Sequence, residues 1–279
     1  MRSLQSVAPI QFARLQRGLR VVGGVALGLG VALGCVWSPG SPLALDRADA
    51  ALAQDEPQKA LEIYAAAERW GWTQTIREHA MFRSALVEAT AMDNAGAAAI
   101  ALEDFVEVGK ADAMLADAYA LLGGVYASTG TDANRAAGAF EAAARRAPED
   151  ARVASWYAAA ASSRELAGDP VGALRDLGHL VSLGGLSAVD GWVGIGRIRF
   201  ELGDLAGAYD AYQNGLLERP DPSRRQIVRL GMAHALERLG EADAAVAELD
   251  EFVGVEDPAF EAARGRMLAR VEARRSESD

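Results

Sequence analysis

Six alanines recur at nearly constant intervals along the 279-residue chain, each among small and apolar residues at helical spacing. The intervals are 38, 38, 37, 35 and 37 residues, and the alanines are Ala60, Ala98, Ala136, Ala173, Ala208 and Ala245. A chain that repeats one unit of this length builds a stack, in which each unit buries its apolar face against its neighbours. The recurrence therefore predicts a repeat protein without a single central core.

The unit is clearest between Trp192 and Pro220, where two short amphipathic helices are predicted around a central Gly-Asp break. Small residues on both helices would let the two backbones approach closely. The pattern consists of Trp192, Ile195, Gly196, Arg199, Gly203, Ala208, Tyr212, Gly215 and Pro220. This order and spacing resemble the tetratricopeptide repeat (TPR), a helix-turn-helix unit of about 34 residues.

The resemblance implies an all-α fold, a right-handed α-solenoid of about six TPR-like repeats over residues 43–257. A C-terminal capping helix is expected over 258–275, which gives about thirteen helices in all. In the capping helix Phe260, Ala263, Met267 and Val271 fall on one face. Helix starts are predicted at Asp169, Asp221 and Asp257, because each acid precedes a proline that is tolerated at the first helical position.

The N-terminal part has a different character. Residues 1–20 are basic, with four arginines and no acid, and residues 21–37 carry no charge. A linker with two prolines follows over residues 38–42. Seventeen uncharged residues lie at the lower limit for a membrane span and somewhat above the apolar core of a signal peptide. We expect this N-terminal hydrophobic helix to be a signal or an anchor.

Cys35, the only cysteine in the chain, lies near the end of this apolar segment, directly after Ala32-Leu33-Gly34. This resembles the bacterial lipobox, which implies that Cys35 is a candidate for lipidation, although Ala32 stands where the family prefers leucine. The alternatives are an uncleaved membrane span, an ordinary secretory signal and a buried helix. For a lipoprotein signal and for an uncleaved span alike, the arginines stay in the cytoplasm, and the repeats are expected in the periplasm or at the cell exterior.

Charge and motif content exclude several classes of function. The net charge is −11, and the chain contains only two lysines, so a nucleic-acid partner is not expected. The three histidines, His79, His179 and His234, lack metal-ligand spacing. We find no phosphate-binding loop, no dinucleotide-binding loop and no nucleophile elbow. We therefore expect no enzyme, no metal and no cofactor.

The repeat family implies that a protein or peptide partner, as a helix or an extended segment, binds in a groove lined by the first helix of each repeat. Candidate groove residues are Arg83, Val193, Arg197, Phe200, Leu230, His234 and Arg238. Together with the N-terminal segment, the repeat resemblance predicts a membrane-anchored protein-interaction scaffold of the bacterial cell envelope. The alternatives are a solute- or glycan-binding TPR lipoprotein of a transport system and a structural subunit of a membrane complex. The oligomeric state is left open.

Overall fold

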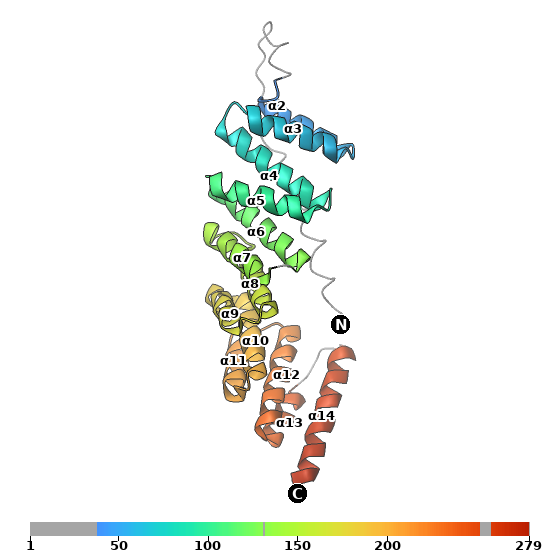
Figure 1. Ribbon diagram of the computed structural model, residues 1–279. Helices are drawn as coiled ribbons and strands as arrows, with labels where there is room; N and C mark the ends of the chain where they lie inside the picture. Colours follow the sequence, from blue (N-terminus) through green and yellow to red (C-terminus); the bar gives the residue numbers. More distant parts are fainter. Residues whose placement is uncertain (1–37, 131, 252–257, 279) are drawn as a thin grey trace. The chain divides into compact units, whose positions relative to one another are not determined.

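The computed structural model describes residues 38–130, 132–251 and 258–278. Segments 1–20 and 21–37, Cys35 and the helix start predicted at Asp257 lie outside these residues. Over the described ranges the chain forms thirteen helices and no strand, which confirms the predicted helical fold (Figure 1). They are α2 (Pro42–Ala53), α3 (Pro57–Trp70), α4 (Gln74–Thr90), α5 (Ala95–Val108), α6 (Asp112–Thr129), α7 (Ala133–Arg146), α8 (Val153–Leu166), α9 (Pro170–Leu183), α10 (Gly185–Glu201), α11 (Leu205–Leu217), α12 (Pro222–Leu239), α13 (Ala242–Asp250) and α14 (Pro258–Ser278).

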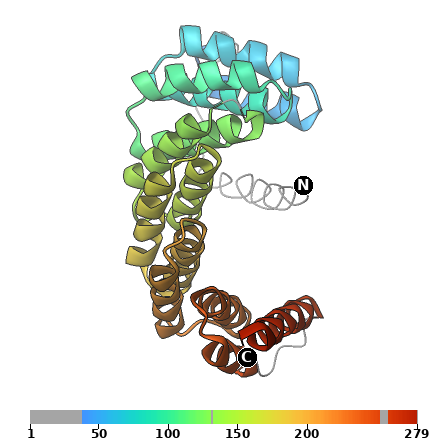
Figure 2. The ribbon, with the colours of Figure 1, turned by 60° about the horizontal axis from the view of Figure 1, so that its bottom comes forward.

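The helices form six pairs followed by α14, and the pairs succeed one another in chain order (Figure 2). Each helix packs against the next one along the chain. We call the first helix of a pair its A helix and the second its B helix. The A helices of neighbouring repeats also touch, α2 with α4, α4 with α6 and α10 with α12. This is a TPR-like α-solenoid. None of its described helices is sufficiently long and apolar to span a membrane.

The alanines that mark the repeat occupy equivalent places in the B helices. All six are completely buried. Because an alanine side chain is a single methyl group, it lets the A helix of the same repeat approach closely. The apolar core is accordingly divided into several small clusters between consecutive helices.

Glycines at the turns and the helix contacts explain the rest of the repeat pattern. Gly203, between α10 and α11, has φ +83° and so adopts a left-handed conformation that disfavours other residues. A Cβ on Gly196 would lie 2.8 Å from the ring of Tyr212, and one on Gly215 would lie 3.2 Å from Cβ of Trp192. The close approach predicted for these small residues is confirmed.

Two of the three predicted helix starts fall within the described residues, and both are confirmed. An Oδ1 oxygen of Asp169 accepts the backbone N–H of Gly172 at 2.9 Å, and that of Asp221 accepts the backbone N–H of Arg224 at 2.9 Å. Each carboxylate thus satisfies one of the amide groups that a helix leaves unpaired at its N-terminus.

The last helix closes the stack as the sequence suggested. Met267 and Val271 are buried against Leu236 and Leu249, while Phe260 and Ala263 are half-buried. The helix continues to Ser278, three residues beyond the predicted end at 275. Its C-terminal residues include neither glycine nor proline after Gly265, so the sequence supplies no helix breaker there.

Ion pairs join every repeat to the next at a regular sequence separation. In each pair the acid belongs to the earlier repeat and the arginine to the later repeat or to α14, 32 to 35 residues further on. The pairs are Asp49–Arg83, Glu103–Arg135, Asp117–Arg152, Glu141–Arg175, Glu165–Arg197, Asp190–Arg224 and Glu237–Arg270. We call this series the ion-pair ladder. Most of these pairs are partly exposed, and each exposed pair contributes less than about 1 kcal/mol.

Candidate functional site

The structure brings together six of the seven groove residues on two neighbouring A helices. Helix α10 carries Val193, Arg197 and Phe200, and helix α12 carries Leu230, His234 and Arg238. Val193 and Phe200 pack partly into the cluster around Tyr212, and Leu230 packs partly into the cluster under α14. Because α10 and α12 touch, their side chains form one continuous surface.

Phe200, His234 and Arg238 form the centre of this surface, and we call them the aromatic–cation cluster. The rings of Phe200 and His234 have centroids 4.4 Å apart and are tilted by 39°. The guanidinium carbon of Arg238 lies 5.6 Å from the centroid of the Phe200 ring, within cation–π distance. The half-buried Phe200 ring is thus held from α12 by two side chains one helical turn apart.

The two arginines near the cluster differ in their ionic partners. Arg197 donates to Glu165 at 2.6 Å and to Glu201 at 3.2 Å, and the hydrogen bond to Glu165 is the main cause of its raised pKa. Arg238 makes no ion pair within the described part of the chain. The charge of Arg197 is therefore largely balanced, whereas that of Arg238 is not.

Arg83 lies apart from these six residues, at the junction of the first two repeats. It donates to Asp49, which also accepts the hydroxyl proton of Tyr64. Burial, followed by the hydrogen bond to Asp49, raises the pKa of Tyr64. Arg83 is thus engaged in packing α4 against α2. Val87, one turn later on the same helix, is buried in that interface and does not face outward.

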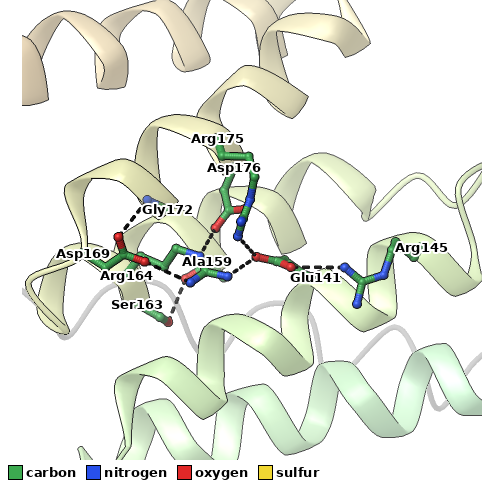
Figure 3. A network of polar contacts seen from close by, with 9 residues as sticks. All are labelled: Glu141, Arg145, Ala159, Ser163, Arg164, Asp169, Gly172, Arg175 and Asp176. Carbon is green, nitrogen blue, oxygen red and sulfur yellow. Dashed lines mark hydrogen bonds and ion pairs between the residues drawn. The ribbon is translucent and has the colours of Figure 1, made fainter.

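A buried polar network between the third and fourth repeats was not singled out from the sequence (Figure 3). Arg164 on α8 is its centre: Nε donates to Asp176 at 2.8 Å, one Nη donates to Asp169 at 3.1 Å, and the other donates to Glu141. Arg175 also donates to Glu141, at 2.8 Å. Asp176 is completely buried on α9. The guanidinium thus holds together carboxylates from α7 and α9.

The pKa values in this network follow from burial and from the shared arginine. Burial, followed by the nearby charge of Glu141, raises the pKa of Asp176. Burial opposes ionisation of Glu141 as well, but its hydrogen bonds, first of all with Arg164, outweigh this effect and lower its pKa. All three carboxylates are occupied by Arg164, so the network serves to join repeats. One signal for it exists in the sequence: Asp176 interrupts the apolar face formed by Ala173, Leu177 and Leu180.

A surface cavity of about 390 Å³ lies near the other end of the stack, between α3, α4 and α5. It is lined by Glu68, Gln74, Arg77, Glu78, Met81 and Val108. None of these side chains is aromatic, so the cavity lacks the stacking surface that a sugar ring would use. In the described part of the chain, no group of three or more potential ligands is arranged for a metal ion.

Comparison with known proteins relates the structure to solved repeat proteins. No protein-family model matches the sequence. No curated protein matches it either. A tetratricopeptide repeat protein from Parabacteroides merdae is similar with a TM-score of 0.47 and 15% identity, over 85% of this chain and 91% of that one. The TPR2AB domain of yeast Sti1, in complex with an Hsp90 peptide, gives 0.39 and 13%, over 82% and 97%. NprR, in complex with its cognate peptide NprX, gives 0.39 and 14%, over 92% and 76%.

Proposed function

We propose that this protein is a non-enzymatic interaction scaffold, held at a bacterial envelope membrane by its N-terminal segment, that binds a protein segment across α10 and α12. The aromatic–cation cluster is the observation that carries the proposal. It places an aromatic ring, an imidazole and an arginine that pairs with no acid among the described residues on the A helices of two adjacent repeats.

The chemistry of this cluster defines the kind of segment that it would bind. Aromatic and arginine side chains dominate the energetics of protein interfaces, and Phe200 with Arg238 offers both within one contact. Phe200 and Leu230 would receive an apolar side chain. Arg238 would receive a carboxylate, because no acid of the described chain pairs with it. The expected partner is therefore a helix or an extended segment that carries an acid beside an apolar residue.

The anchoring part of the proposal is supported by the sequence of the N-terminal segment. The uncharged residues 21–37 follow a basic stretch, and Cys35 stands near their end. Labelling cells with a palmitate analogue separates the two leading forms of the anchor. Label that is present on the wild type and absent from Cys35→Ala identifies a lipoprotein. An unlabelled chain that stays in the membrane fraction identifies an uncleaved span.

A peptide library displayed on phage, selected on the full-length protein, tests the recognition surface. We expect selected peptides to combine Asp or Glu with a large apolar residue, and Arg238→Glu to weaken their binding by at least tenfold. Loss of a contact at an interface hot spot corresponds to about that factor. Dissociation constants measured by fluorescence anisotropy give the comparison.

Arg266→Glu provides the matched control, because Arg266 is exposed on α14 and undergoes the same change of charge. It should leave peptide binding within about twofold of the wild type. Equal losses in the two variants would show that net charge governs binding and that the cluster is not the site. Phe200→Ala should reproduce the loss caused by Arg238→Glu without changing the net charge.

A further inference from the structure

Two tryptophans stand exposed at the turn that joins α3 to α4. Trp70 ends α3 and is 62% exposed, and Trp72 follows Gly71 and is 58% exposed. The other tryptophans of the described chain behave differently: Trp156 is buried and Trp192 is half-buried. Two indoles left in water beside each other mark an interaction surface, because indole combines a large apolar area with one polar N–H group. We call residues 70–73 the tryptophan turn.

The tryptophan turn is tied to the beginning of the described chain. The backbone N–H of Trp72 donates to the carbonyl oxygen of Gly40 at 3.0 Å. Gly40 is pressed so closely against the turn that a Cβ there would lie 1.9 Å from the carbonyl oxygen of Trp70. Only glycine fits this position. The backbone at residue 40 is therefore fixed beside the two indoles.

Chain length then limits how far the turn can be from the apolar segment. The uncharged run ends at Trp37, three residues before Gly40. Three trans peptide links span at most about 11 Å. If residues 21–37, or a lipid on Cys35, enter a bilayer, the tryptophan turn cannot be far from the surface of that bilayer.

The composition of the turn suits that position. Tryptophan is enriched where the acyl chains of a bilayer meet the headgroups, since its ring prefers that boundary. Arg69 lies over the ring of Trp70 with its guanidinium carbon 5.7 Å from the ring centroid, and Arg77 donates to the carbonyl oxygen of Gly71 at 2.8 Å. Leu43, at the start of α2, adds a further exposed apolar side chain. Cationic side chains beside the indoles would face phosphate groups.

We infer that the tryptophan turn inserts into the headgroup boundary of the membrane and sets the first repeat directly on the bilayer. This inference rests on the proposed membrane anchor and adds a second point of contact to it. A chain attached at one point could rotate freely about its linker. With a second contact, the first repeat is held in one orientation relative to the membrane.

Quenching of tryptophan fluorescence by brominated lipids tests the inference on the full-length chain. The chain is reconstituted into vesicles of phosphatidylcholine and phosphatidylglycerol, with or without bromine on the acyl chains. Trp37→Phe is present throughout, so that this residue does not contribute. We expect bromine to quench the emission of this parent protein, and Trp70→Ser combined with Trp72→Ser to remove at least half of the quenched signal. Trp192→Phe is the matched control for the loss of an indole and should keep the quenching.

The other outcomes are separable. Flotation of the vesicles reports the anchor by itself: a chain that stays at the bottom of the gradient contradicts the anchor, and with it this inference. A chain that floats while bromine fails to quench Trp70 and Trp72 contradicts the inference alone. Aqueous iodide then identifies the alternative, since quenching by iodide means that the indoles face water. Protection from both quenchers means that protein, either the N-terminal segment or a partner, covers them.

Discussion

Replacing Arg164 with methionine is expected to lower the free energy of unfolding by about 3–5 kcal/mol at neutral pH. The guanidinium is the shared partner of Asp169, Asp176 and Glu141. Methionine fills much of the same volume but leaves the buried charge of Asp176 beside that of Glu141, with only the largely exposed Arg175 and Arg145 as cationic partners. Chemical denaturation followed by circular dichroism measures the loss.

Arg175→Met is the matched control for this variant. Arg175 contacts the same carboxylate of Glu141, but its side chain is 56% exposed and water can replace it. We expect a loss below about 1 kcal/mol, as for other surface ion pairs. Equal losses at positions 164 and 175 would show that burial of the network does not determine its contribution.

The effect of Arg164→Met should depend on pH in a defined direction. Without the guanidinium, the buried carboxyl of Asp176 binds a proton more readily in the folded variant than in the unfolded chain, so acidification favours the folded variant. The loss should therefore shrink as the pH falls from 7 toward about 4, the ordinary range of carboxyl groups. In the wild type the two carboxyls act in opposite directions. The raised pKa of Asp176 gives a contribution that is present at low pH and is lost as the pH rises through that pKa, whereas the lowered pKa of Glu141 gives a contribution that is lost on acidification.

Alanine at two adjacent glycines of α6 should have opposite effects, which differ by about 2–4 kcal/mol in the free energy of unfolding. A Cβ on Gly123 would lie 2.9 Å from ring atoms of Phe140 on α7, whereas a Cβ on Gly124 would meet no atom within 4 Å. Gly123→Ala forces the two helices of the third repeat apart and should destabilise the protein. Gly124→Ala only restricts the unfolded chain and should stabilise it by about 1 kcal/mol.

Urea denaturation of the two variants and the wild type shows, in one experiment, whether each substitution raises or lowers the free energy of unfolding. The substitution, the helix and the sequence neighbourhood are the same, so differences in helix propensity cancel. A stabilising Gly123→Ala would mean that the Phe140 ring moves without cost and that close contact between A and B helices is not required.

Features set by local sequence could be predicted, and the recurring unit is the best example. Ala208, Gly203 and Asp204 act within a few residues of their own position, through burial, a left-handed turn and an N-cap on α11. The capping helix could be predicted for the same reason, because its apolar residues recur on one face within the helix itself. Grouping of Phe200, His234 and Arg238 could be predicted as well, because equivalent positions of adjacent repeats lie side by side.

Interactions that depend on three elements at once could not be predicted in this way. Arg164 takes its partners from α7, from α9 and from the turn before α9, and no spacing along the chain specifies that convergence. The ion pair between Arg83 and Asp49, 34 residues earlier, likewise joins two repeats, and no local pattern specifies it. The turn that carries Trp70 and Trp72 is also bound to Gly40, and no local spacing specifies that contact.

The ion-pair ladder gives the stack a direction, because each acid belongs to the earlier unit and each arginine to the later one. The helices that carry a pair differ between junctions, since Asp49–Arg83 joins the A helices α2 and α4 whereas Glu103–Arg135 joins the B helices α5 and α7. Excision of the second repeat would leave Asp49 on an A helix and Arg135 on a B helix, so the two remaining modules would not restore the pair. Arg270 of α14 supplies the final cation to Glu237 of α12, so the closing helix is matched to the sixth module.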